Sequence, residues 1–230
     1  MDFLLGDITL ILARWVHFLA GVIWIGLLYY FNFVQAPFFA EIDGSVKNVA
    51  ITKLVPKALL WFRFGALWTF LSGLFYLMAY GHANGVAIFS TSWGVNILIG
   101  ALLGTTMFAN VWLLIWPNQK VVIQSATQVV SGGQPLPNAA ACAAKATLAS
   151  RHNVLFSIPM LLFMGMAKHF GYNVGPDRRM ILWIVVLVLI GALEVNAIKG
   201  KLGPMTSIQG VILSGFALAA ILFVVVRVLA

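Results

Sequence analysis

ITLILARWVHFLAGVIWIGLLYYFNF, residues 8–33, is the stretch that decides the fold. It is longer than the roughly 20 mainly apolar residues that a helix needs to cross a bilayer. Five further stretches of the same kind follow, which predicts an all-α, polytopic membrane bundle of about six transmembrane helices in one domain covering residues 1–230. The predicted spans are residues 8–33, 58–80, 93–117, 148–170, 180–198 and 208–229.

The composition supports a lipid environment for most of the chain. Hydrophobic residues make up 62% of it and charged residues only 9%, whereas soluble domains carry about 25% charged residues. The net charge of +8 is spread over connections and helix ends, as membrane topology places basic residues. We therefore expect the lipid bilayer, and no nucleic acid, as the partner of this surface.

Lysines gather at one side of the predicted bundle. Seven of them fall at the ends of the spans opposite the N-terminus: Lys47, Lys53, Lys57, Lys120, Lys145, Lys199 and Lys201. Cytoplasmic connections are enriched in Lys and Arg. The distribution predicts a multi-pass protein of the bacterial inner (plasma) membrane with both termini on the periplasmic side.

Polar side chains within a span are costly and mark candidate functional sites. In the first span, Arg14, His17, Gly21 and Trp24 follow at spacings of three, four and three residues and share one helix face. A neutral imidazole in this place is a potential ligand of haem b or another metal, with Arg14 and Trp24 beside the cofactor. The alternative is a histidine that only hydrogen-bonds a neighbouring helix.

A second polar group is expected nearer the lysine side. Arg63 and Glu194 lie at similar depth and carry opposite charge, which predicts an ion pair. As a functional pocket, Arg63 would bind an anion or a carbonyl, Glu194 would carry a proton, and His152 would act as acid, base or metal ligand. Asn110 and Asn153 would orient a substrate. The alternative is a structural pair that sets helix register.

The two candidate metal ligands, His17 and His152, are predicted at different depths. Counting 1.5 Å per residue from the N-terminal side puts His17 roughly 13 Å deep and His152 roughly 25 Å deep. This difference argues against one haem held between them.

Four stretches resemble the membrane domain of the PuuD-type urate oxidases, also called urate hydroxylases. They are RWVHFLAGVIWIG at 14–26, VPKALLWFRFG at 55–65, NVWLLIWPNQK at 110–120 and SRHN at 150–153. The resemblance implies purine catabolism by oxidation of urate to 5-hydroxyisourate, with electrons passing to a cytochrome c. It also adds Arg151 to the substrate-binding group and carries over Arg14, His17, Trp24, Arg63, Asn110, His152 and Asn153.

The sequence differs from that family at its C-terminal side. With Cys142 as its one cysteine, the chain contains no C-x-x-C-H motif for a covalently attached haem. We expect a short form without the cytochrome c domain, whose electron acceptor is a separate protein or a bound cofactor.

Three functions are therefore compatible with these patterns. The first is a redox enzyme of the urate-oxidase kind. The second is a non-catalytic haem b electron carrier, or an accessory subunit of a larger membrane complex for respiration or oxygenation. The third is a transporter or proton-conducting protein, which Arg63 and Glu194 suggest but which lacks the inverted repeat of many transporters.

Overall fold

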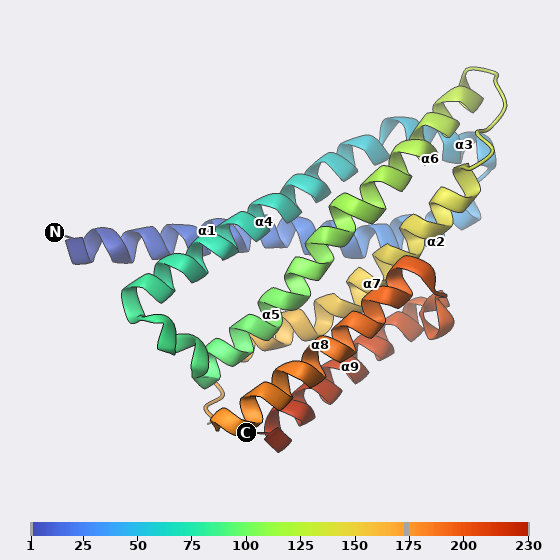
Figure 1. Ribbon diagram of the computed structural model, residues 1–230. Helices are drawn as coiled ribbons and strands as arrows, with labels where there is room; N and C mark the ends of the chain where they lie inside the picture. Colours follow the sequence, from blue (N-terminus) through green and yellow to red (C-terminus); the bar gives the residue numbers. More distant parts are fainter. Residues whose placement is uncertain (1, 173–174, 230) are drawn as a thin grey trace.

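The computed structural model describes residues 2–172 and 175–229, and these residues form helices and no strand. Figure 1 shows the long helices crossing the molecule side by side. The elements are α1 (Asp2–Tyr29), η1 (Tyr30–Gln35), α2 (Ala36–Glu41), α3 (Gly44–Lys53), α4 (Val55–Asn84), η2 (Val86–Ser90), α5 (Ser92–Ala109), η3 (Asn110–Ile115), α6 (Trp116–Val130), α7 (Ala139–Met166), α8 (Pro176–Lys199), η4 (Gly203–Thr206) and α9 (Ile208–Leu229). The predicted all-α bundle is confirmed.

Two helices are much longer than predicted. α1, η1 and α2 join into one helix through Glu41, and α5, η3 and α6 join into a helix of 39 residues, Ser92–Val130. In both, a π-helical segment joins two α-helical parts, and the second α-helical part has a proline as its second residue. At 1.5 Å per residue the second helix is about 58 Å long. It therefore extends beyond a hydrocarbon core of about 30 Å.

Five helices of the described chain are long and apolar enough to cross a membrane: Gly6–Glu41, Val55–Asn84, Ser92–Val130, Pro176–Lys199 and Ile208–Leu229. The remaining predicted span, 148–170, is present as the 28-residue helix α7 but is not among the five. It begins and ends earlier than predicted, and its polar residues 150–153 reduce its apolar character. The long apolar helices mark a membrane protein.

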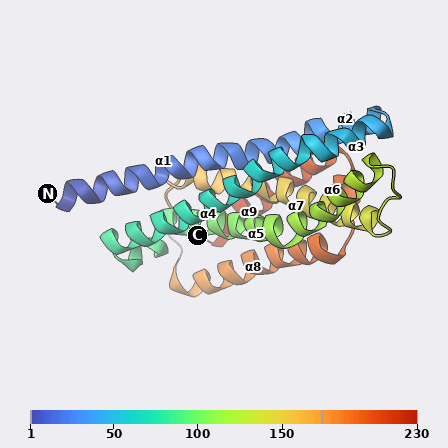
Figure 2. The same cartoon turned by 90° about the horizontal axis from the view of Figure 1, so that it is seen from above.

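Successive long helices alternate in direction (Figure 1). Both chain ends, the α4–α5 connection and the α7–α8 connection lie at one end of the bundle, which we call the terminal end. The α2–α3, α6–α7 and α8–α9 connections lie at the other end, which we call the lysine end. Figure 2 shows the same arrangement from above, with α1 along α4 and α8 on the opposite side of the bundle.

Helix α7 is the centre of the packing. It contacts α1, α5, α6, α8 and α9, and Phe156 and Phe163 on it are fully buried. By contrast, many apolar side chains of the surrounding helices are exposed on the outside, including Val22 (74%) and Leu113 (71%). An apolar exterior of this kind suits lipid.

Helices α1 and α4 approach closely at Gly65. A Cβ atom at this position would lie 3.1 Å from the backbone nitrogen of Trp24 and 3.4 Å from the carbonyl oxygen of Ala20. Small residues permit such close contact between membrane helices. The pair α1–α4 therefore forms a tight unit that borders the rest of the bundle.

This contact gives a stability prediction. Gly65→Ala should destabilise the protein by about 1–2 kcal/mol relative to Gly191→Ala, because the backbone of α1 cannot move aside as a side chain would. Gly191 on α8 is the matched control, since a Cβ there meets no atom within 4 Å. Thermal unfolding in detergent measures the difference. Equal midpoints for the two variants would contradict the close approach.

Candidate functional site

The polar segment 150–153 of α7 binds both π-helical segments. Asn32 in η1 donates to the hydroxyl of Ser150 over 2.8 Å and to the carbonyl of Leu28 over 2.9 Å. Asn153 donates to the carbonyl of Met107, just before η3, over 3.0 Å. A π-helical turn changes the helical hydrogen-bond pattern and is frequent at functional sites. Here each π segment has its polar partner on α7.

Asn110, Asn153 and Glu194 come together at this level from η3, α7 and α8. The amide nitrogen of Asn110 donates to Asn153 Oδ1 and to Glu194 Oε2, both over 3.0 Å. Asn110 and Asn153 are buried, and Glu194 is half-buried. The structure thus places three of the predicted lysine-side residues in one hydrogen-bonded group.

His152 is fully buried and both of its ring nitrogens have partners. Nδ1 lies 2.9 Å from the carbonyl oxygen of Leu148, which only accepts, so Nδ1 carries the proton. Nε2 then accepts from the amide of Asn196 over 2.8 Å. Asn196 was not among the predicted residues, although an amide within an apolar span was a signal. In this arrangement His152 has no nitrogen free for a metal or a substrate.

The predicted ion pair between Arg63 and Glu194 is wrong. The guanidinium of Arg63 stacks on Trp116, with Cζ 3.4 Å from the ring centroid, and its Nε donates to the carbonyl of Leu59. Glu194 binds Asn110 instead. The prediction matched the two residues by depth, but depth does not determine which way a helix face points. α4 packs along α1, whereas α8 packs on α7.

Arg151 also lies outside the hydrogen-bonded group of Asn110, Asn153 and Glu194. Its side chain is 8% exposed, and its buried Nη1 has no hydrogen-bond partner among the described residues. The predicted substrate-binding residues are therefore split among three environments: the Asn110–Asn153–Glu194 group, the Arg63–Trp116 stack and the isolated Arg151.

A cavity of about 700 Å³ lies toward the terminal end, between α1, α4, α5 and α7. His17 lines it. Its Nδ1 lies 2.8 Å from the carbonyl oxygen of Thr69, so this nitrogen carries the proton. The described residues offer Nε2 no hydrogen bond. A Cβ on Gly73 would lie 2.9 Å from the imidazole Cε1, so the glycine leaves room for the ring.

The other members of the predicted outer group line the same cavity. Trp24 is 2% exposed, and its buried indole Nε1 has no described partner. Arg14 donates from Nη2 to the hydroxyl of Tyr76 over 2.6 Å. Three residues of α4 that were not predicted complete this wall: Thr69, Gly73 and Tyr76. Their spacing of four and three residues was the available signal.

The structure does not bring the two candidate metal ligands together. His17 lines the cavity, whereas His152 belongs to the buried hydrogen bonds nearer the lysine end. Among the described residues there is no group of three or more His, Cys, Asp or Glu side chains that could hold a bare metal ion. A single protein ligand such as His17 suits a metal that brings its own further ligands, as haem does.

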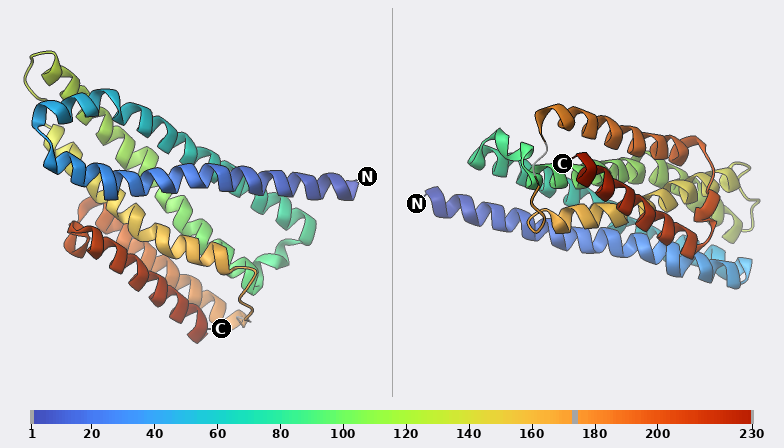
Figure 3. Two further views of the ribbon diagram at one scale, coloured as in Figure 1. Left: turned by 180° about the vertical axis from the view of Figure 1, so that it is seen from behind. Right: turned by 90° about the horizontal axis from the view of Figure 1, so that it is seen from below.

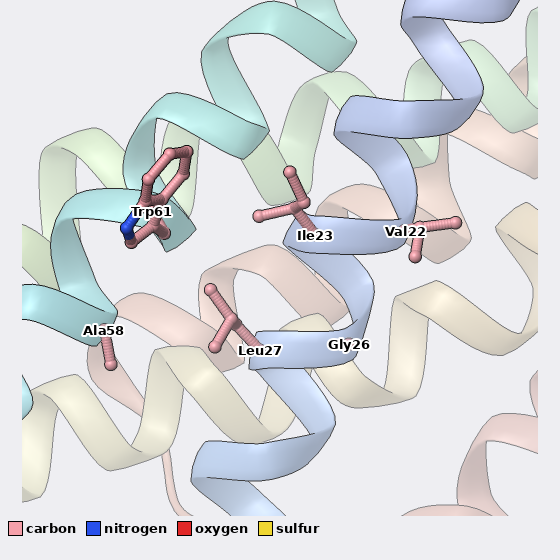
Figure 4. A pocket seen from close by; sticks show the side chains of 6 residues that line it. All are labelled: Val22, Ile23, Gly26, Leu27, Ala58 and Trp61. Carbon is pink, nitrogen blue, oxygen red and sulfur yellow. The ribbon is translucent and has the colours of Figure 1, made fainter.

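A second, smaller hollow of about 380 Å³ lies between α1 and α4. Figure 4 shows Ile23 and Leu27 of α1 on the side of Ala58 and Trp61 of α4. Its lining side chains are apolar apart from the indole nitrogen of Trp61, and Trp61 as a whole is 62% exposed. It offers no group for acid–base or ligand chemistry.

Comparison with known proteins identifies one family. The model of the family described as Urate oxidase N-terminal matches residues 85–227, which is more than half of the chain. No curated protein and no solved structure matches the chain. The matched region includes η3, the polar segment of α7 and Glu194, and it begins after the His17 helix. The chain therefore belongs to the Urate oxidase N-terminal family.

Proposed function

We propose that this chain is an integral-membrane redox protein of the PuuD type that oxidises urate to 5-hydroxyisourate. Membership of the urate oxidase N-terminal family supports the substrate. The observation that carries the redox assignment is the cavity of about 700 Å³ with His17 on its wall. Its volume is in the usual range for a cofactor or small-molecule site.

Three features of the cavity support haem b as the cofactor. The bond from Nδ1 to the Thr69 carbonyl orients the ring and leaves Nε2 for iron, which is the usual outer-shell arrangement of a metal-bound histidine. The buried indole Nε1 of Trp24 donates to no described residue, so it is available to a bound ligand. Apolar side chains form most of the remaining wall. When bound, haem b would supply one-electron redox chemistry.

The reaction needs an electron acceptor and a place for protons. Urate and one water yield 5-hydroxyisourate, two electrons and two protons. We propose a cytochrome c or another separate acceptor for the electrons. For a proton we propose Glu194, whose carboxylate accepts a hydrogen bond from Asn110.

We propose the side chains around Glu194 as the substrate-binding region, with Asn110 and Asn153 as hydrogen-bonding groups and His152 as acid or base. Arg63 and Arg151 would contribute positive charge for an anionic purine. Because His152 and Asn153 are fully buried and already bonded, substrate access requires these hydrogen bonds to open.

That closed network favours a second candidate function, a non-catalytic haem b electron carrier or an accessory subunit of a larger membrane complex. A carrier needs the cofactor cavity but no substrate pocket, so the buried hydrogen bonds would then only hold the helices in register. For either function, the seven lysines at the lysine end support a bacterial inner-membrane location with both chain ends on the periplasmic side.

The cofactor proposal predicts a visible absorption spectrum. The full chain purified from membranes should show a Soret band and reducible α and β bands, and His17→Ala should lose them because the iron loses its protein ligand. His82→Ala is the matched control, since His82 is exposed at the end of α4. A wild-type protein without a Soret band would refute the haem assignment.

The enzyme and carrier proposals differ in substrate turnover. Membranes that contain the chain should consume urate when an oxidised cytochrome c is supplied, with two equivalents of cytochrome c reduced per urate. If the haem spectrum is present but urate is stable, the carrier function replaces the enzyme. His82→Ala should retain turnover, and His17→Ala should reduce it at least tenfold.

Variants at the Asn110–Glu194 hydrogen bond can distinguish a structural role of Glu194 from a proton-carrying role. A double-mutant cycle of Asn110→Ala and Glu194→Leu should give a coupling energy of about 0.6–1.7 kcal/mol between the two side chains in the free energy of unfolding. Glu194→Gln keeps a hydrogen-bond acceptor and should leave stability near wild type while lowering urate turnover. Normal turnover in Glu194→Gln would exclude the proton role.

A further inference from the structure

The charges around the cavity are placed unevenly. Its lining includes Arg14, which lies three residues before His17 on α1, and Lys168 and His169 just after the end of α7. These basic residues lie toward the terminal end, because α1 leaves that end and α7 returns to it. None of the described lining residues is acidic. The part of the cavity nearest the terminal end, which we call its mouth, therefore carries only positive or neutral groups among its lining residues.

The deeper part of the cavity has a different character. Beyond His17 the wall includes apolar side chains such as Ile25 and Met160. The polar atoms there are few and include the indole Nε1 of Trp24, which has no described partner. A ligand that fills this space must be mainly apolar at one end.

The guanidinium at the mouth is held in place. Arg14 donates to Tyr76 over 2.6 Å, and its Cζ lies 5.2 Å from the centroid of the Tyr76 ring. Tyr76 in turn stacks on Tyr80 with ring centroids 5.6 Å apart. No described acidic side chain forms an ion pair with Arg14 or Lys168, so both cations are available to an anion.

From this distribution we propose that the cavity binds an amphipathic anion in one orientation, with carboxylates at Arg14 and Lys168 and an apolar body extending past His17 toward Trp24. Hydrogen bonds between a cation and a carboxylate are about twice as strong as neutral ones. The surrounding membrane also weakens screening of the charges. A neutral lipid with a ring system, such as a sterol or a quinone, would leave Arg14 and Lys168 without an anionic partner.

This inference rests on the proposed haem b cofactor and specifies how it lies. Haem b is a flat apolar ring system with two carboxylates on one edge. Its carboxylate edge would face the terminal end, and His17 would face the iron. The orientation places the charged edge of the cofactor, rather than its apolar edge, on the side where a soluble electron acceptor would approach.

The test compares haem b with its dimethyl ester, which keeps the ring and the iron but has no carboxylates. Both are titrated into the haem-depleted full chain in nanodiscs of phosphatidylcholine, and binding is followed at the Soret band. Wild type should bind the free acid at least about tenfold more tightly than the ester, as expected when a charge-assisted bond is lost.

Variants test which cations cause the preference for the free acid over the ester. Arg14→Gln with Lys168→Gln should bind acid and ester with similar affinity. Lys199→Gln with Lys201→Gln removes the same charge at the lysine end and should keep the wild-type preference. The comparison of the two ligands on wild type stands even if a variant fails to fold, which circular dichroism and gel filtration would show.

The outcomes separate the two proposals. Binding of acid and ester with equal affinity to wild type would overturn the orientation and leave the haem site standing. Equal loss of preference in both double variants would also overturn it, because the effect would then come from net charge. Failure of wild type to bind either ligand would overturn the haem cofactor itself.

Discussion

The hydrogen bonds of the polar segment 150–153 organise the bundle. In lipid, a polar side chain has no water to bond and must find partners inside the protein. Ser150 accepts a hydrogen bond from Asn32 of η1, and His152 accepts one from Asn196 of α8. Asn153 accepts one from Asn110 and donates one to the carbonyl of Met107, just before η3. The helix that carries this polar segment, α7, is therefore the central one, and its neighbours are ordered around it.

The same constraint divides the bundle into two halves. Near the lysine end, the polar side chains bind one another and the packing is closed. Toward the terminal end, α7 presents Met160 and Met164 to the cavity instead. Among the described residues, the last hydrogen bond between α1 and α7 in this direction joins Tyr29 and Ser157. Figure 3 shows α1 diverging from α7 toward the N-terminus. The cavity lies in this half, and His17 lies on its wall.

His17 and His152 have different hydrogen-bonding environments in the same bundle. In both, Nδ1 is fixed by a backbone carbonyl, from Thr69 and from Leu148 respectively. The difference is at Nε2. Asn196 occupies it in His152, whereas in His17 it has no hydrogen-bond partner among the described residues. Burial alone therefore does not distinguish the two histidines, but the partner of the second ring nitrogen does.

The amino-acid sequence by itself determined the fold class and five of the spans, because long apolar runs and the lack of charge can be read without knowing any contact. It also identified Arg14, His17 and Trp24 as one helix face, since helical spacing is a local property. The tertiary structure decided which faces meet. Arg63 and Glu194 share a depth but lie on helices with different neighbours, so the predicted ion pair does not form. Thr69 and Gly73 belong to the site only because α4 packs along α1, a contact between distant segments that spacing along one helix does not encode.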